Sequence, residues 1–229
     1  SRYLTLGKRW GRSVEKPLRV LAVISNPNDL SKYNLASLDE EQERCLLKET
    51  VGHLSSEKVQ LDFLEPPVTL KRLERELRTA HNGEGYHVLH FVGHGTFSQR
   101  REQAALFMQD AEGHAQVVKD DEFIAMLKRL QPQALNLIYL AACQSAERAK
   151  TDAFAGLAPQ LVRAGVPAVV AMQDKVAMTT ARQMTTDFYG ELLRHGAVDR
   201  ALNAARSTLL TAEHPDAAVP TLFMRLKDG

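Results

Sequence analysis

The sequence predicts an α/β fold: a mostly parallel central sheet, helices on both faces and a small β-hairpin insertion. Short apolar runs typical of buried strands recur along the chain, and amphipathic segments with helical spacing separate them. This alternation favours parallel strands joined by helical crossovers. The length of 229 residues, with 44% apolar and 25% charged side chains, suits one domain with a sizeable core.

In the first half of the chain, strands alternate with helices. The expected strands are short apolar or alternating runs that span 19–25, 59–64 and 87–93. Helical spacing of apolar residues predicts one helix over 38–54 and a second that opens at Thr69, after the break at Pro66-Pro67. Cys45 is expected on the apolar face of the first of these helices, in the core.

The second half begins with the hairpin insertion. Residues 105–110 and 115–118 flank the turn signal Glu112-Gly113. Residues 96–102, with Arg100-Arg101, are expected to form a solvated loop; the alternatives are a mobile loop near the site and an internal cleavage point. Further strands are expected at 135–140, 166–172 and 221–226. Further helices are expected at 120–130, 153–164, 179–195 and 198–210.

The net charge and the number of cysteines limit the kinds of partner and the cellular compartment that we expect. The 29 basic and 28 acidic side chains leave a net charge of +1, so we expect no direct nucleic-acid or membrane partner. No apolar run approaches the ~20 residues that span a bilayer. Two cysteines suit a reducing, cytoplasmic compartment and neither form a disulfide framework nor supply a Cys-rich zinc site.

The domain boundary is expected near residue 17. Residues 1–17 are interpreted as an N-terminal linker or extension, and 18–229 as one domain. Because the sequence begins at Ser1 without an initiator Met, we expect it to be cropped from a larger multidomain protein.

Two residues with reactive side chains directly follow core strands. His94 comes after Phe91-Val92-Gly93, and Cys143 comes after Leu140-Ala141-Ala142. In a parallel sheet the carboxyl ends of strands meet at one edge, so neighbouring strands would bring an imidazole and a thiol together. A thiol needs a nearby base or a helix N-terminus to become a nucleophile. The pattern therefore indicates a Cys-His pair.

The residues around this pair support acyl-transfer chemistry. The glycines beside His94 allow a substrate backbone to approach, and the amides of Gly95 and Cys143 could bind a developing oxyanion. A single buried cysteine is more often an inert core residue, but the joint pattern at two strand ends favours chemistry. His87 and His90 do not share a strand face well enough for metal ligation, so we expect no metal and no cofactor.

The chain resembles the CHAT domain, a family of caspase-like cysteine peptidases in the clan of separases and gingipains. Residues 86–95 resemble the family's histidine motif, 140–146 its cysteine motif, and 154–158 and 164–173 the stretch that follows. Cys143 lies 49 residues after His94, close to the ~50 of caspases. The resemblance covers roughly 17–229, so it implies that 18–229 is the peptidase domain.

This resemblance implies a caspase-like three-layer sandwich and a cysteine endopeptidase. Cys143 would be the nucleophile and His94 the general acid/base, and the amides of Gly95 and Cys143 would form the oxyanion hole. A protein substrate would be cleaved through a thioester without a cofactor. No third catalytic residue is obligatory in caspase-like enzymes.

The resemblance also suggests a specificity pocket. In this clan it is lined by the loop after the first strand, the residues before the cysteine and the loop after the fifth strand. The substrate-binding candidates here are Asp29, Ala141, Gln173, Asp174 and Lys175. Many relatives continue Met-Gln with an aromatic residue and Pro, but this chain has Asp174-Lys175. A basic residue before the scissile bond is favoured if Asp174 faces the pocket, and an acidic one if Lys175 does; alternatively, both are solvated loop charges.

Two other functions are compatible with the sequence. One is a catalytically latent CHAT-like module that binds a partner, and the other is a small-ligand-binding α/β domain without covalent chemistry. Because CHAT domains commonly accompany repeat, sensor or nucleotide-binding modules in bacterial defence systems, the resemblance implies control by regulatory domains or partner proteins.

Overall fold

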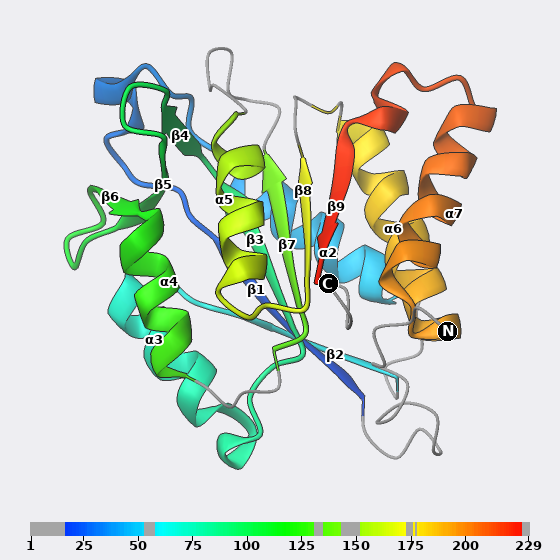
Figure 1. Cartoon of the computed structure of the whole chain (residues 1–229), viewed down its shortest axis with the longest axis horizontal. Helices are drawn as coiled ribbons and strands as arrows, with labels where there is room; N and C mark the ends of the chain where they lie inside the picture. The colour runs from blue at the N-terminus through cyan, green and yellow to red at the C-terminus, as the bar shows by residue number, and fades with distance from the viewer. Residues whose placement is uncertain are drawn as a thin grey trace.

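The predicted α/β class is confirmed by a computed structural model that describes residues 17–52, 58–130, 135–142, 152–172, 176 and 178–225. The described part of the chain forms a six-stranded sheet in the order β2-β1-β3-β7-β8-β9 (Figure 1). All its pairs are parallel except β8–β9. The strands are β1 (Leu18–Ile24), β2 (Val59–Phe63), β3 (Val88–Gly93), β7 (Leu137–Ala142), β8 (Ala168–Met172) and β9 (Pro220–Met224).

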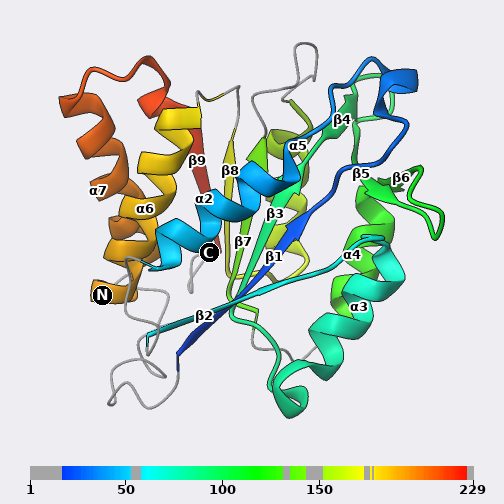
Figure 2. The ribbon, with the colours of Figure 1, turned by 180° about the vertical axis from the view of Figure 1, so that it is seen from behind.

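Helices cover both faces of this sheet and complete a three-layer sandwich of the caspase-like kind. One face carries α3 (Leu70–Thr79), α4 (Asp120–Arg129) and α5 (Asp152–Arg163). The other carries α2 (Glu40–Gly52), α6 (Met178–His195) and α7 (Val198–Thr211), as the front and back views show (Figures 1 and 2). Short 3₁₀ turns are η1 (Leu30–Tyr33), η2 (Ala80–Gly83) and η3 (Pro215–Ala218). No helix among the described residues is long and apolar enough to span a membrane.

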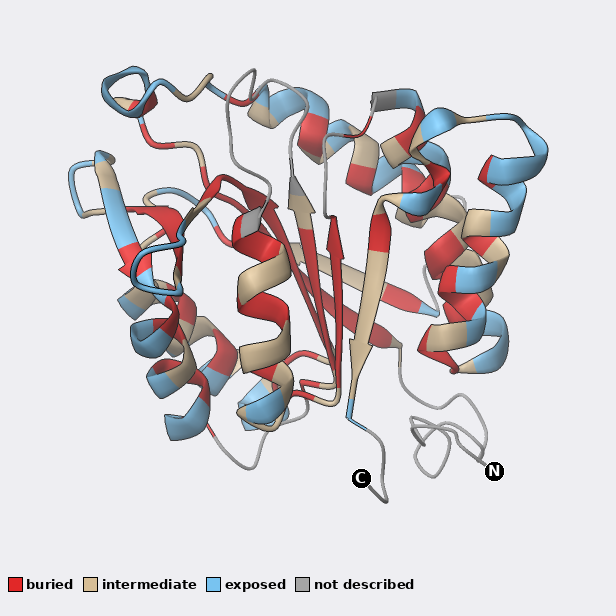
Figure 3. Ribbon diagram, turned by 45° about the horizontal axis from the view of Figure 1, so that its top comes forward, coloured by how far each residue is buried: buried red, intermediate tan, exposed pale blue. Residues whose placement is uncertain are grey.

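The central strands lie between these helical layers because most of their side chains are apolar on both faces. Every residue of β1 is buried, as expected for a central parallel strand (Figure 3). In β3, Leu89 and Phe91 join the core under α3–α5, whereas Val88 joins the core under α6 and α7. The alternation of side chains therefore builds two hydrophobic cores from one strand.

A second, antiparallel sheet in the order β4-β5-β6 contains the expected hairpin. Its strands are β4 (Gly95–Ser98), β5 (Gln103–Gln109) and β6 (Ala115–Lys119). The expectation of a loop over 96–102 is wrong for its first part, because β4 pairs with β5 there. Phe97 of β4 packs on Gly156 of α5, where an added Cβ would come within 2.7 Å of the ring. This tertiary contact supports a strand whose own sequence has little alternation.

The expected burial of Cys45 is also wrong. Helix α2 buries Glu43, Leu47 and Thr50, which form a stripe at helical spacing, and Cys45 lies outside that stripe and is exposed. Its thiol donates a hydrogen bond to Glu49 Oε1 over 3.4 Å, and this contact raises the pKa of Cys45. The stripe is rotated because α2 packs beside α6, where the Thr50 and Thr186 hydroxyls lie 3.3 Å apart.

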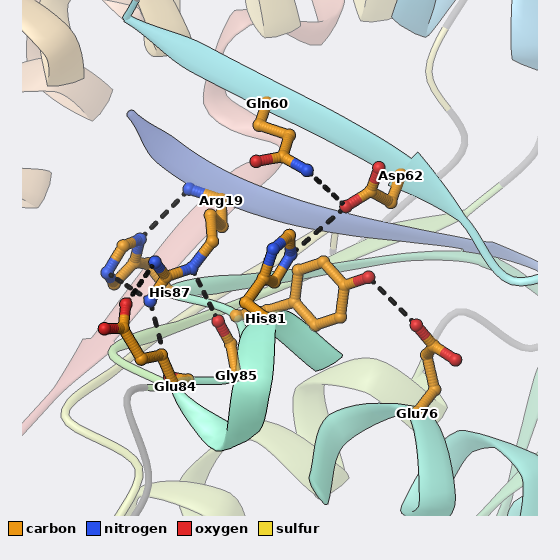
Figure 4. Close-up of polar contacts among 9 residues, drawn as sticks. Arg19, Gln60, Asp62, Glu76, His81, Glu84, Gly85 and His87 are labelled. Carbon is orange, nitrogen blue, oxygen red and sulfur yellow. Dashed lines mark hydrogen bonds and ion pairs between the residues drawn. The ribbon is translucent and has the colours of Figure 1, made fainter. Parts of the chain in front are cut away.

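At the amino-terminal edge of the sheet, polar contacts join β1 to the turn that precedes β3 (Figure 4). The buried Arg19 guanidinium donates to the Gly85 carbonyl over 2.7 Å and to the half-exposed Glu84 carboxylate over 2.9 Å. The amide of Arg19 donates to His87 Nδ1 over 3.0 Å. These bonds join β1 to the turn before β3, so the cluster has a structural explanation.

Under α6, the middle of β3 carries a buried histidine. His90 stacks on Tyr139 of β7 with ring centroids 4.6 Å apart, and its Nδ1 lies 3.0 Å from the Tyr189 hydroxyl. Burial lowers the pKa of His90 from 6.5 to about 3. The imidazole therefore stays neutral in the folded protein through mildly acidic pH.

This histidine should make folding stability depend on pH. In the unfolded chain His90 takes up a proton near pH 6.5, whereas in the folded chain it does so only near pH 3. Its contribution to stability is therefore present above pH 6.5 and is lost as the pH falls through this window, with a loss on the order of a few kcal/mol. We expect His90→Phe to flatten the fall of the urea midpoint between pH 6.5 and 4, with His114→Gln at the exposed hairpin turn as control. An unchanged slope in His90→Phe would contradict this account.

Candidate active site

The pairing of β3 with β7 sets the geometry of the candidate site. The two strands are parallel neighbours, and their register places Gly93 opposite Ala142 at the carboxyl ends. His94 is the next residue after Gly93, and Cys143 is the next residue after Ala142. Cys143 itself lies outside the described residues. The register thus aligns the two strand ends that lead into the predicted pair.

The same edge is the topological switch point of the sheet. From β1 the chain goes to β2 on one side of β1 and then to β3 on the other side. In open α/β sheets, binding crevices form outside the carboxyl ends of strands where the connections diverge in this way. The carboxyl end of β3 lies at the upper edge of the sheet in Figure 1, and His94 directly follows this strand in the sequence.

His94 is buried, at 2% exposure, and its imidazole ring has one hydrogen-bond partner among the described residues. Its Nε2 lies 2.8 Å from the carbonyl oxygen of Ala36, in the segment between η1 and α2. A carbonyl only accepts, so Nε2 carries the proton and Nδ1 carries the lone pair of the neutral ring. Burial lowers the pKa of His94, and the hydrogen bond to Ala36 partly opposes this shift. The ring is therefore held neutral, and within the described part of the chain Nδ1 has no hydrogen-bond partner.

The backbone of His94 is anchored by the second sheet. The carbonyl of His94 accepts a hydrogen bond from the amide of Phe107 over 3.0 Å. The carbonyl of Phe107 accepts a hydrogen bond from the hydroxyl of the buried Ser25, at the end of β1, over 2.8 Å. The strand ends of β1 and β3 are thus joined through β5. Ser25 was missed by sequence reasoning, because its role becomes evident only when the second sheet docks against the first.

The amide of Gly95 faces away from its partner strand. Because Phe107 bonds to His94, the next antiparallel pair, Gly95 and Leu106, is the one whose amides point outward. Strand β4 is the edge of its three-stranded sheet, so the Gly95 amide is directed away from β5 and is not used in the pairing of that sheet. The first turn of α5 lies beside it, since a Cβ on Gly95 would come within 2.7 Å of the Ala153 methyl group. A helix N-terminus adds positive potential at this point.

The predicted specificity residues have different outcomes. Gln173, Asp174 and Lys175 lie outside the described residues. Asp29 is described: its Oδ1 accepts the Ala115 amide over 2.6 Å and its Oδ2 pairs with Lys32 over 3.1 Å. The bond from Ala115 lowers the pKa of Asp29. These contacts tie Asp29 to β6 and η1, so they favour a structural role, and its role in substrate binding stays a prediction.

Ala141 lies in an apolar cluster at the carboxyl edge. It is half-buried against Leu38, Val92 and Ile24. The cluster lies between the end of β3 and the start of α2, on the face of the sheet that α2 covers. The cluster packs against the segment whose Ala36 carbonyl bonds to His94. No group of three or more His, Cys, Asp or Glu side chains within the described ranges is arranged to hold a metal ion.

The close packing at Gly95 leads to a testable expectation. A methyl group there would lie 2.7 Å from the Ala153 Cβ and 3.2 Å from the Ala105 carbonyl oxygen, so β4 and α5 would have to separate. We expect Gly95→Ala to destabilise the fold by about 1–3 kcal/mol, measured by urea unfolding. Gly52→Ala is the matched control, because a methyl group at residue 52 would have no neighbour within 4 Å. Equal stabilities of the two variants would argue against tight packing at Gly95.

Comparison with known proteins agrees with the geometry. The family model described as the CHAT domain matches residues 5–223, which is most of the chain. No match was found among curated proteins. The matched range contains both core strands that lead into the predicted pair and the second sheet between them. The chain belongs to the CHAT domain family, whose fold is related to that of the caspase-like cysteine peptidases.

Proposed function

We propose that this chain is a cysteine endopeptidase domain that cleaves protein substrates with Cys143 and His94. The observation that carries the proposal is the parallel register of β3 and β7, which aligns Gly93 with Ala142. The residues that directly follow these two are the proposed base and the proposed nucleophile. The neutral state of His94, with its lone pair on Nδ1, supports its role as base.

In the proposed reaction, His94 Nδ1 takes the proton of the Cys143 thiol. The thiolate sulfur attacks the scissile carbonyl carbon, and the carbonyl electrons move to the oxygen. When the C–N bond breaks, the imidazolium returns its proton to the leaving amine and a thioester remains. Water then attacks the thioester while His94 takes its proton, the C–S bond breaks, and the imidazolium returns the proton to the Cys143 sulfur, which releases the acid and restores the free thiol.

The negative oxygen of the intermediate needs donors that are in place before it forms. The outward amide of Gly95 supports its assignment to an oxyanion hole, with the Cys143 amide as its proposed second donor. The N-terminal turn of α5 beside Gly95 adds to the stabilisation of negative charge. The same potential would favour the thiolate of Cys143.

Substrate choice and control belong to the same proposal. Asp174 would select a basic residue before the scissile bond, or Lys175 an acidic one. We further propose that other domains or partner proteins, in a cytoplasmic bacterial signalling or defence system, regulate the site.

One observation favours a latent ground state: His94 is 2% exposed, so a substrate would need to open its surroundings. A CHAT-like module that stays closed and only binds a partner is therefore the second candidate.

Thiol labelling tests the proposed pair directly. We expect iodoacetamide at neutral pH to modify Cys143 in a Cys45→Ser background, and His94→Ala to slow this labelling by roughly 10²-fold, because general-base assistance is worth ~10²–10⁴-fold. Cys45 in a Cys143→Ala background is the internal comparison, since Cys45 is exposed but the pKa of its thiol is raised by Glu49. Mass spectrometry of timed samples gives both rates.

Equal, slow labelling of the two thiols, unaffected by His94→Ala, would remove the support for a Cys-His pair. A peptide library then separates the two candidates. Cleavage that is lost in Cys143→Ala indicates an active domain. Fast, His94-dependent labelling without cleavage of any peptide indicates the latent module.

A further inference from the structure

The hydrogen bond that orients His94 depends on a backbone atom. Ala36 contributes its carbonyl oxygen, and the segment that carries it is the irregular stretch between η1 and α2. An irregular segment can move relative to the sheet unless something holds it. The position of the Ala36 carbonyl must therefore be fixed by contacts on either side of it.

Asn26 supplies this contact from the opposite end of the loop. Its Oδ1 accepts the amide of Leu38 over 2.9 Å, and its Nδ2 donates to the carbonyl of Leu38 over 3.0 Å. Both polar backbone groups of one residue are thus bound by one side chain, two residues beyond Ala36. The amide plane of Asn26 matches such a pair of bonds, and a single hydroxyl or methyl group does not.

Asn26 is itself held against the two sheets. The preceding residue, Ser25, donates its amide to the Val92 carbonyl over 2.8 Å, which continues the pairing of β1 with β3. The carbonyl of Asn26 accepts a bond from Gln109 Nε2 at the end of β5 over 3.1 Å. Gln109 is buried, and its Oε1 also accepts the amide of Val68. The backbone at Asn26 is therefore held in place by both sheets, and this fixes the position of its side chain.

We infer that Asn26 is a positioning residue for His94. Its side chain fixes Leu38, the Leu38 segment fixes the Ala36 carbonyl, and the carbonyl holds the proton of His94 on Nε2. Without Asn26, the neutral imidazole loses its fixed acceptor and the proton distributes between Nε2 and Nδ1. The catalytic consequence rests on the proposed function, but the effect on the tautomer of His94 does not.

The tautomer is measurable without any peptidase activity. The whole chain with Cys143→Ala is labelled at its histidines with ¹⁵N, and long-range ¹H–¹⁵N spectra report which ring nitrogen is protonated. Loss of the signals in His94→Gln assigns them. In the Cys143→Ala chain with Asn26 intact, we expect the Nε2–H tautomer of His94 to dominate. Asn26→Ala should lower the tautomer ratio roughly fivefold or more, the factor that one net hydrogen bond supplies.

Two further variants make the test specific. Asn28→Ala is the matched control, since Asn28 lies in the same loop. Its hydrogen bond to the Gly113 carbonyl is donated by the backbone N–H, so the substitution does not remove it. It should leave the His94 signals unchanged. Asn26→Asp keeps the size and the acceptor for the Leu38 amide but loses the donor to the Leu38 carbonyl. It should shift the ratio in the same direction as Asn26→Ala, and it provides the answer if Asn26→Ala does not fold.

Unchanged His94 signals in the folded Asn26 variants would overturn the inference, whatever the activity of the domain. If the chain cleaves peptides, Asn26→Ala should lower kcat by roughly 10- to 100-fold with little change in KM, because a misplaced base costs up to ~10²-fold. A tautomer shift in a chain that cleaves nothing would retain the positioning role and count against the proposed peptidase alone.

Discussion

The parallel pairing of β3 with β7 is the constraint on which the candidate site depends. Side chains alternate along a strand, so a register shift of one residue moves every side chain of that strand to the other face. The observed register aligns Gly93 with Ala142. The shared face carries His90 opposite Tyr139, with α6 packed over them. Large buried rings on one face make any other register costly, so the core of the domain secures the alignment of its functional edge.

The two buried histidines of this region illustrate how environment separates structural from chemical roles. His90 lies in the middle of β3, enclosed by rings, and burial takes its pKa to about 3. Its ring therefore stays neutral near pH 7. His94 lies beyond the strand end, where a backbone carbonyl favours a proton on one nitrogen while burial keeps the ring neutral. The opposition of these two influences suits proton exchange.

The polar groups at the two edges of the sheet also differ in role: one group is structural, and the other adjoins the candidate site. At the amino-terminal edge, Arg19 binds backbone carbonyl and carboxylate groups of the turn before β3, and the bonds close a connection (Figure 4). At the carboxyl edge, the Asn26 side chain binds the backbone of Leu38, and the Ser25 hydroxyl binds the carbonyl of Phe107. Both groups of contacts satisfy backbone groups, and the second lies beside the Ala36 carbonyl that bonds to His94 Nε2.

Local patterns along the chain were enough to predict the α/β class, the order of strands and helices, the hairpin and the two strand-end motifs, because periodicity and the residues after a strand are local properties. They also placed His94 and Gly95 at the edge where the structure has them. Contacts between distant segments established the rest: β4 is a strand, Cys45 is exposed, Asp29 is bound to β6, the Ala36 carbonyl bonds to His94, Asn26 bonds to Leu38 and Ser25 bonds to Phe107. The Ala36 contact uses a backbone oxygen that every residue possesses, so no side-chain pattern could reveal it.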